Sequence, residues 1–186
     1  MNRNQPIARL FMARHRRKGA FDMDGSEDIF ARLKEDHDRH RNLLDRLLDT
    51  ATAGSAARAA IFETLTKELK GHAAAEEQAL YSTMLRKPRT TAETRHSVAE
   101  HHEIEEALNN LAATDISSDA WLTRFKELDH RYRHHIDEEE NEHFPDFERY
   151  LTDEDRAWMR SVFERRKREE TAAAEVTPEK KEDAKE

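Results

Sequence analysis

The sequence predicts an all-α protein, an up-down-up-down four-helix bundle with an additional short C-terminal helix and flexible ends. Charged residues make up 39% of the 186 residues and apolar residues 36%, which is typical of long helices with one buried face. Only four glycines and four prolines are present, too few for the many turns of a sheet protein. Apolar residues recur at helical spacing, and long helices joined by short loops pack as antiparallel neighbours.

Two helices are expected in the first half of the chain. Ser26 is expected to cap the first, which carries apolar residues at helical spacing and runs to about Asp49. A loop over residues 50–54 follows, and Ser55 is expected to cap a second helix that Pro88 stops. At roughly 30 residues, this second helix would be about 45 Å long.

Two more helices are expected in the second half. Thr90 with Glu93 three residues later matches a capping box, which opens a third helix ending near Ala113. Ser118 is expected to cap a fourth helix, which Pro145 interrupts. These two helices and their connection repeat the hairpin of the first half.

A fifth, shorter helix is expected outside the bundle, because Thr152 and Asp155 match another capping signal. From Thr171 onward the residues are small or charged, as in disordered segments. The chain is therefore divided into a basic N-terminal extension (1–25), a four-helix bundle (26–150), a C-terminal helix (151–170) and a disordered tail (171–186).

Composition narrows the function classes. A net charge of -8 argues against nucleic acid or an anionic membrane as the partner, because both require a basic surface. Without a secretory apolar run or a membrane span, a cytoplasmic location is expected, and the oligomeric state is left open. The chain has no cysteine and eleven histidines, so any metal must bind through imidazole and carboxylate groups.

Polar residues occupy several inward positions of the four expected helices. When each apolar stripe is extended in alternating steps of three and four residues, five histidines and three glutamates fall on the buried seams. They are His37, His40, His72, Glu76, His101, Glu105, His135 and Glu139. A carboxylate buried without a partner costs several kcal/mol, on the order of the desolvation penalty of an ion, so these positions need an explanation. A metal cluster provides one, and the alternative is a buried, salt-bridged polar network without metal.

The spacing of these residues repeats between the halves. His72 with Glu76 and His135 with Glu139 are pairs four residues apart, so each pair presents two ligand atoms from one helix face. His37 precedes His72 by 35 residues, and His101 precedes His135 by 34. Two irons, held by imidazoles and bridged by the two glutamates, fit such a doubled hairpin.

The chain resembles the hemerythrin-like family, also called the HHE cation-binding domain, over roughly residues 26–150. The resemblance rests on LKEDH ending at His37, HAAAEE from His72, EHHEI containing His101, and HHIDEEENEHFP containing His135. It implies a four-helix bundle with two Fe ions and a bridging oxo or hydroxo group, which bind dioxygen (O2), hydrogen peroxide (H2O2) or nitric oxide (NO). It further implies His37, His72, His101 and His135 as terminal ligands and Glu76 and Glu139 as bridges.

One departure from the family pattern bears on activity. Oxygen-carrying hemerythrins have two histidines four residues apart on the third helix, whereas Ser97 stands four residues before His101 here. His96, Glu105, His40 or a water is left to complete the coordination. An open position favours reaction over reversible carriage.

Several residues near the seams have ordinary interpretations. His40 is expected to be a hydrogen-bond partner or a core histidine rather than a ligand. Tyr132 is expected to be a core aromatic, with the alternative that its hydroxyl contacts a bound oxygen species. Glu77, Glu138 and Glu140 are expected on solvated faces, and His15, His130 and His134 at the surface.

Three function classes are compatible with this pattern. The first is a non-haem di-iron protein that reacts with or senses a small oxidant, either as a catalase-like enzyme, as a nitric-oxide-reactive oxidoreductase or without catalysis. The second is a non-catalytic oxygen- or iron-binding sensor or storage module that signals through a partner. The third is a metal-free helical scaffold. The ligand types favour iron, with manganese as the alternative, over zinc.

Overall fold

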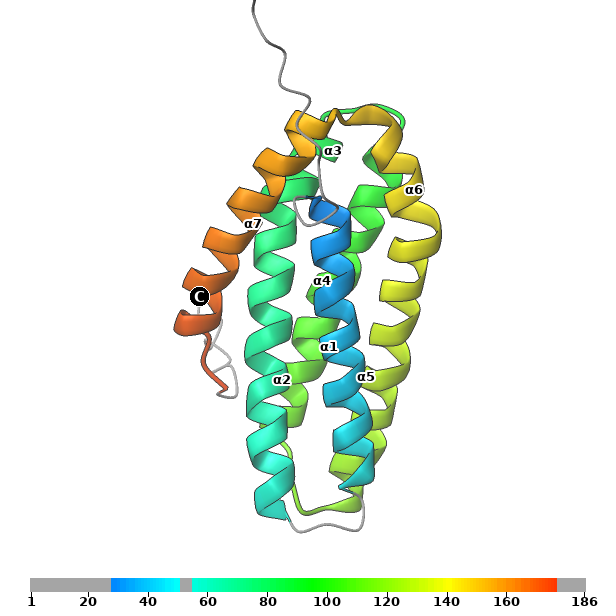
Figure 1. Ribbon diagram of the computed structural model, residues 1–186. Coiled ribbons are helices and arrows are strands. Elements are labelled where there is room, and N and C mark those ends of the chain that lie inside the picture. Colours follow the sequence, from blue (N-terminus) through cyan, green and yellow to red (C-terminus); the bar gives the residue numbers. More distant parts are fainter. Residues whose placement is uncertain (1–27, 51–54, 177–186) are drawn as a thin grey trace, which may run out of the picture.

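Four long helices form the body of the protein in the computed structural model, which describes residues 28–50 and 55–176 (Figure 1). They are α1 (Ile29–Asp49), α2 (Ser55–Glu76), α4 (Thr91–Ala112) and α5 (Asp119–Glu138). They lie side by side along one axis, with α1 in contact with α2 and α5, and α4 in contact with the same two helices. Within the described residues all regular structure is helical, which confirms the all-α class.

Two apolar clusters fill the interior of the bundle, and the polar seam residues lie between them along the helices. One cluster is built around Leu44, Leu65, Leu108 and Phe125, and the other around residues of the opposite end such as Leu80. On α1, for example, the buried His37 and His40 separate Leu33 of one cluster from Leu43 of the other. The core is therefore interrupted by a buried polar layer that every long helix crosses.

In each hairpin, one π-helical segment extends the second long helix. The π-helix η2 (Glu77–Tyr81) follows α2 and leads into α3 (Ser82–Met84). The π-helix η3 (Glu139–His143) follows α5 and leads into α6 (Phe144–Phe147) and the 3-10 turn η4 (Glu148–Tyr150). π segments are rare and are often found at functional sites. Here η2 begins one residue after Glu76 and η3 begins at Glu139, so their starting points in the two hairpins differ by one residue.

Pro145 does not interrupt the fourth helix, contrary to the sequence expectation. The helix passes through η3, and Pro145 lies in the first turn of α6. A proline within an α-helix removes one hydrogen bond and its ring meets the preceding turn, whereas the first turn of a helix tolerates it. The change from π to α geometry immediately before Pro145 provides such a first turn.

The caps of the first two helices differ from the expected residues. Asp28 caps α1, because its side chain accepts a hydrogen bond of 2.9 Å from the backbone N–H of Phe30. Ser26, the expected cap, lies outside the described residues. Ser55 is the first residue of α2 rather than its cap. Both helices still begin within three residues of the predicted position.

The capping box expected at Thr90 and Glu93 is wrong. Thr90 precedes α4, but its side chain makes no capping bond and instead donates to the backbone oxygen of Met84 at 2.8 Å. The hydroxyl therefore closes the turn between α3 and α4. Ser118, by contrast, caps α5 as expected and accepts a hydrogen bond from the backbone N–H of Trp121.

The fifth helix, α7 (Asp153–Ala173), is longer than predicted and packs on the outer side formed by α2 and α1 (Figure 1). Thr152 and Asp155 form the expected capping box. The helix continues through residues 171–173, which were expected to be part of a disordered tail, because this end of α7 lies against α2. The remainder of that tail, from 177 onward, lies outside the described residues.

Gly71 allows α7 to approach α2 closely. A Cβ atom at this position would overlap the side-chain oxygen of Thr171 and lie 3.1 Å from its backbone nitrogen. A glycine within a helix costs about 1 kcal/mol relative to alanine. The close approach of α2 and α7 explains why a glycine is present next to His72.

Replacing Gly71 with alanine is therefore expected to destabilise the protein. We expect a loss of about 1–3 kcal/mol, as for other overpacked contacts, because the overlap with Thr171 outweighs the gain in helix propensity. Urea unfolding measures the loss. The double variant Gly71→Ala/Thr171→Ala removes the contact with the Thr171 oxygen and should recover part of the lost stability. A Gly71→Ala protein as stable as the wild type would show that this contact does not limit how α7 packs.

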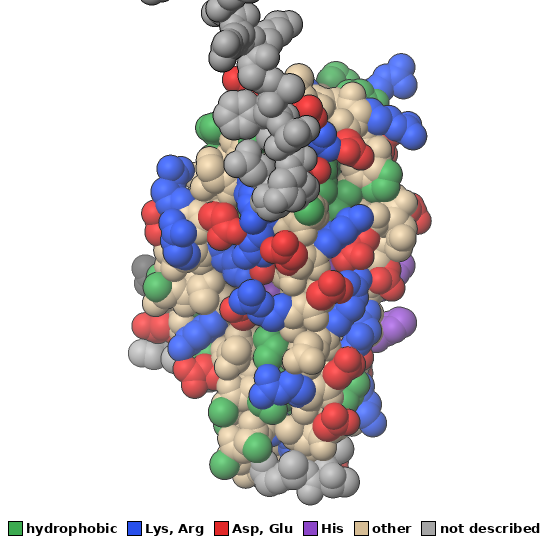
Figure 2. Space-filling model, viewed as in Figure 1, with side chains coloured by type: hydrophobic (Ala, Val, Ile, Leu, Met, Phe, Trp, Pro, Cys, Tyr) green, Lys and Arg blue, Asp and Glu red, His purple; other side chains and the backbone are tan. Residues whose placement is uncertain are grey.

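Acidic and basic side chains are interspersed on the face shown in Figure 2, without a large patch of one sign. This distribution agrees with the long, amphipathic helices expected from the composition. Among the described helices, none combines the length and the apolar character needed to cross a membrane.

Candidate metal centre

Four histidines from four helices direct their Nε2 atoms toward two buried glutamates. Glu76 Oε2 lies 3.4 Å from His72 Nε2 and 3.6 Å from His101 Nε2. Glu139 lies 3.4 Å from His37 Nε2 through Oε2 and 3.2 Å from His135 Nε2 through Oε1. Each carboxylate thus spans two imidazoles from different helices. The six residues selected from the sequence are therefore brought together in one buried layer.

The outward nitrogen of each of these histidines meets a carboxylate. The Nδ1 atoms donate hydrogen bonds from His37 to Glu140 at 2.8 Å, from His72 to Asp36 at 3.2 Å, from His101 to Glu77 at 3.0 Å and from His135 to Glu100 at 2.9 Å. Such bonds fix the ring orientation and leave the Nε2 lone pair pointing inward. Histidines that bind metals commonly have this partner.

Two of these carboxylates correct the sequence interpretation. Glu77 and Glu140 were expected on solvated faces, and the side chain of Glu77 is indeed 42% exposed, but each also holds the histidine of a neighbouring helix. Asp36 and Glu100 were not selected at all. A sequence signal did exist, because all four acids stand directly beside a selected residue, at 36–37, 76–77, 100–101 and 139–140. The repeat between the two hairpins therefore includes the carboxylates that hold the histidines of the centre.

The centre contains buried carboxylate and imidazole atoms that the protein itself leaves without hydrogen-bond partners. Both carboxylate oxygens of Glu76, Oε2 of Glu139 and Nε2 of His101 are buried without a hydrogen-bond partner among the described residues. Burial and the neighbouring charge of Glu76 raise the pKa of Glu139 well above its usual range. Burial opposes the charged form of Glu76 as well, but the attraction of His72, whose Nε2 lies 3.4 Å away, outweighs it and lowers the pKa of Glu76 to about 2.

A cation among these atoms would satisfy all of them at once. A charge without a partner in the low-dielectric interior destabilises the fold by several kcal/mol, on the order of the free energy needed to remove the ion from water. Imidazole and carboxylate donors suit iron, manganese and zinc, and paired carboxylates with histidines on facing helices are typical of dinuclear sites in bundles. The donor set therefore fits a metal.

A sequence model of the hemerythrin HHE cation-binding domain matches residues 28–147. The chain belongs to this family. No curated protein and no solved structure matches the chain. As a hemerythrin HHE domain the protein binds a metal cation, and the match covers α1 to α6 but ends before α7. Contacts that α7 makes with the centre therefore come from outside the matched residues.

Lys167 of α7 reaches the centre through Asp36. Its ammonium group lies 2.6 Å from Asp36 Oδ2 and 2.7 Å from Glu68 Oε2, with only 8% of the side chain exposed. Burial opposes ionisation of Asp36, but the bonds from His72 and Lys167 outweigh it and hold its pKa far below the usual range. Asp36 therefore stays ionised and holds His72 on its other side.

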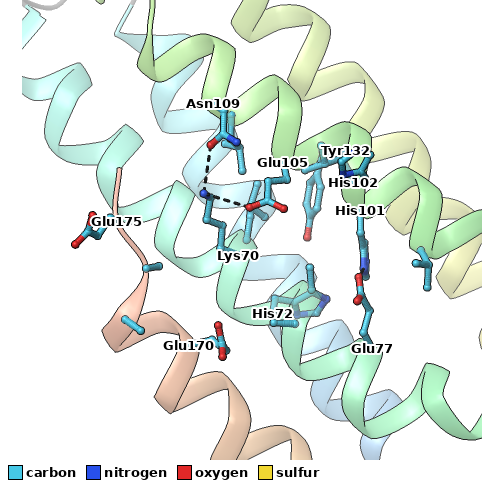
Figure 3. A pocket seen from close by; sticks show the side chains of 18 residues that line it. Lys70, His72, Glu77, His101, His102, Glu105, Asn109, Tyr132, Glu170 and Glu175 are labelled. Carbon is cyan, nitrogen blue, oxygen red and sulfur yellow. Dashed lines mark hydrogen bonds and ion pairs between the residues drawn. The ribbon is translucent and has the colours of Figure 1, made fainter. Parts of the chain in front are cut away.

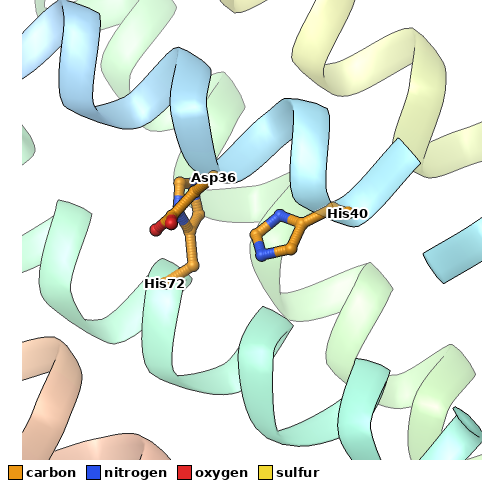
Figure 4. Close-up of side chains that lie close together, drawn as sticks. All are labelled: Asp36, His40 and His72. Atoms are coloured by element: carbon orange, nitrogen blue, oxygen red, sulfur yellow. The ribbon is translucent and has the colours of Figure 1, made fainter. Parts of the chain in front are cut away.

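Asp36, His40 and His72 form a second group whose ligand atoms converge (Figure 4). Arg32 also binds Asp36, at 2.6 Å, and its guanidinium lies over the ring of Phe163 of α7. Two protein cations thus already neutralise this carboxylate. We assign no metal to this group, because Lys167 holds the position that a cation would take.

His40 is buried beside the centre and accepts a hydrogen bond of 2.6 Å from the hydroxyl of Tyr132 at Nδ1. This agrees with the expectation of a hydrogen-bonded core histidine, and it also accounts for the Tyr132 hydroxyl. A second tyrosine, Tyr81 of η2, donates to Glu139 Oε1. The centre is therefore bordered by two buried phenols, one of them on a predicted bridging ligand.

Acid is expected to destabilise the fold partly through His40. Burial lowers the pKa of His40 to about 3, so between pH 6.5 and 3 the unfolded chain binds a proton that the folded protein does not. The free energy of unfolding then falls as the pH is lowered, by about 1.4 kcal/mol per pH unit for one proton. His135, with a pKa of about 4, acts in the same direction.

Replacing His40 with glutamine should lower the number of protons that the chain takes up on unfolding by up to one, and the free energy of unfolding should then depend less on pH. Urea unfolding at pH 7 and pH 5, with a chelator present in every sample, measures the difference. His102→Gln is the matched control, because His102 is exposed and its loss should leave the slope unchanged. Equal slopes for His40→Gln and the wild type would contradict the prediction.

The candidates for the remaining metal ligand lie in different parts of the structure. Ser97 is buried and hydrogen-bonds His143 Nδ1 at 3.1 Å, so that a histidine from η3 adjoins the position where oxygen carriers have their extra histidine. His96 is exposed and faces two glutamates at the surface. Glu105 pairs with Lys70 at 3.3 Å. Neither His96 nor Glu105 therefore points into the buried layer.

A cavity of about 710 Å³ connects the centre with the surface between α2, α4 and the end of α7. His72, His101 and Tyr132 line its buried end, as Figure 3 shows. At the outer end Lys70 binds Glu105 and, at 3.2 Å, Asn109. The cavity gives a small molecule a route to two of the predicted ligands.

Proposed function

We propose that this protein is a non-haem di-iron protein that reacts with or senses a small oxidant, namely dioxygen, hydrogen peroxide or nitric oxide. The proposal includes the up-down-up-down bundle predicted from the short connections, and a cytoplasmic location. His37, His72, His101 and His135 would be terminal ligands. Glu76 and Glu139 would bridge the two irons. Manganese is the alternative metal, since the same donors suit it.

The observation that carries the proposal is the placement of the two glutamates. Each buried carboxylate lies between imidazole nitrogens of two different helices, at 3.2–3.6 Å. Ligand atoms that share a metal at bond lengths of about 2.0–2.2 Å are separated by roughly this distance. Two such carboxylates with four imidazoles provide enough donors for two ions but leave positions free.

The irons would supply redox chemistry, and the surrounding residues would position the reactants. The cavity lined by His72, His101 and Tyr132 admits a molecule of a few atoms to the centre. The apolar clusters on either side of the polar layer exclude bulk water, which strengthens electrostatic interactions inside. The hydroxyl of Tyr132, hydrogen-bonded to His40, lies at the buried end of this route and can hold a proton there.

Metal analysis combined with an optical spectrum tests the proposal. Protein supplied with ferrous iron is expected to hold two irons per chain and to show an oxo-to-iron absorption band. That band should change on addition of peroxide, dioxygen or nitric oxide. Glu76→Ala/Glu139→Ala should lose the iron, whereas the exposed control His102→Ala should keep it. A fully loaded protein that is inert to all three molecules would rule out the redox function.

A second candidate, a sensor that signals through a partner, is favoured by one observation. His72, Asp36 and Lys167 form a continuous chain of polar contacts from the centre to α7. A change at the metal could therefore alter how α7 packs. Hydrogen exchange of α7, compared between oxidised and reduced iron-loaded protein, tests this. Identical protection in both states would contradict a signal through this helix.

A further inference from the structure

Two more histidine–glutamate pairs face each other outside the buried centre. His96 and Glu100 lie one turn apart on α4, and His134 and Glu138 one turn apart on α5. They repeat the His-x-x-x-Glu spacing of the buried pairs. The imidazoles are 56% and 63% exposed, and the carboxylates are less so. Two ligand pairs therefore meet at the surface where α4 and α5 pack together.

The ligand atoms of His96, Glu100 and Glu138 all lie within 4.8 Å of one another, which suits one metal ion, and His134 lies beside this group. His96 Nε2 lies 3.6 Å from Glu100 Oε1 and 3.4 Å from Glu138 Oε2 on the other helix. His134 Nε2 lies 3.7 Å from Glu138 Oε1. Four ligands around a tetrahedral ion, with bonds of about 2.0–2.1 Å, are roughly 3.4 Å apart. The contacts are longer than the 2.7–3.2 Å or so of an N–H···O hydrogen bond.

The arrangement also leaves charge unsatisfied. Oε2 of Glu138 is inaccessible to solvent and has no hydrogen-bond partner among the described residues. Glu100 and Glu138 together carry two negative charges, and within the described part of the chain no lysine or arginine lies within ion-pair distance of either. A divalent cation would neutralise both carboxylates.

We propose that His96, Glu100 and Glu138 form a surface site for one divalent transition-metal ion, separate from the buried centre, and that the exposed His134 turns toward this ion as the fourth ligand. Two imidazoles and two carboxylates are the donors that Zn²⁺ and Fe²⁺ accept. Exposure of the histidines lets an ion arrive directly from solvent. The site needs no opening of the bundle and no displacement of a protein cation.

Glu100 joins this site to the buried centre. Its Oε1 faces His96 at the surface, while its Oε2 accepts the hydrogen bond from His135 Nδ1. A cation on the surface would draw charge from Glu100 and weaken its bond to His135, which makes His135 a poorer electron donor. Because such coupling is reciprocal, ions in the two places should bind less tightly together than apart. This coupling, unlike the surface site itself, rests on the proposed function.

Cobalt titration of the full chain tests the surface site. Cobalt(II) in a four-coordinate site gives strong visible absorption bands, so we expect wild-type protein to bind one more equivalent than His96→Ala/His134→Ala. The difference of one equivalent holds whether or not the buried centre contains iron, so failure of the di-iron proposal would not hide it. Both histidines are exposed, so the helical circular dichroism of the double variant should match that of the wild type.

His102→Ala is the matched control. His102 and Glu106 also form a pair one turn apart on α4, at 3.6 Å, but they have no facing pair in the described residues. The variant should keep the full cobalt stoichiometry and affinity, whereas the double variant should bind the extra ion at least tenfold more weakly. Equal binding by the wild type and the double variant, or an equal loss in His102→Ala, would overturn the proposal.

Discussion

Removal of the metal is expected to lower the midpoint of thermal unfolding by about 10 °C. A metal at a thousandfold excess over its dissociation constant stabilises a protein by about 4 kcal/mol, and each kcal/mol shifts the midpoint by about 2–4 °C in chains of this size. In the metal-free protein the carboxylates of Glu76 and Glu139 lose the cation between them. Differential scanning calorimetry with and without a chelator measures the shift. Equal midpoints would favour the metal-free scaffold.

Glu139→Gln should affect stability differently in the metal-free and the metal-bound protein. The raised pKa of Glu139 means that folded, metal-free protein binds a proton that the unfolded chain releases above about pH 4.5. Stability from this group is therefore lost as the pH rises toward its folded pKa. Glutamine carries no charge, so the metal-free variant should be at least as stable as the metal-free wild type at pH 8. With metal present it should be the less stable protein. A variant that is less stable in both states would contradict this account.

Lys167→Met is expected to cost about 3 kcal/mol, although Lys167 lies outside the matched domain. Removing one partner of a buried ion pair leaves the other charge uncompensated, and here Asp36 is fully buried while Arg32 still provides part of the compensation. Urea unfolding measures the loss. Metal affinity should fall as well, because Asp36 is then free to turn away from His72.

Two controls separate this effect from a general loss of charge. Lys126→Met changes an exposed lysine of α5 and should be neutral within about 0.5 kcal/mol. Lys167→Met/Asp36→Asn removes both charges and should be less destabilised than the two single losses added together. Strict additivity, or a stable Lys167→Met protein, would show that Lys167 does not act through Asp36.

The predicted ligands could be found from the sequence because metal ligands in a bundle obey the helical period. His37, His72, His101 and His135 fall on the same stripes as the leucines, where a polar side chain requires an explanation. The repeated offset between the halves then separates His135 from the adjacent His134, which is exposed. Helical periodicity together with the repeat between the halves was sufficient for these positions.

The carboxylates around the centre escaped the same reasoning for a physical reason. Glu77 and Glu140 each stand one residue after a seam position, which turns them by about 100° toward the helix boundary. In sequence they look like any charged residue of a solvated face. Their role depends on which helix lies beside them, because Glu77 binds His101 of α4 and Glu140 binds His37 of α1.

Backbone details were the least predictable part of the fold. The π segments η2 and η3 have no composition that distinguishes them from α-helix. Pro145 was misread as a stop because its tolerance depends on the π turn before it. Lys167 lies in a charged run at 165–168 that resembles a solvated helix end, and only the docking of α7 makes it buried.

Lysine and arginine side chains surround only one half of the centre. Asp36 and Glu140, which hold His72 and His37, pair with Lys167 and Arg41. Among the described residues no such cation lies within ion-pair distance of Glu77 or Glu100, which hold His101 and His135. Positive charge stabilises the reduced form of a nearby metal. In the di-iron centre proposed above, the iron beside α1 and α2 is therefore expected to be reduced first.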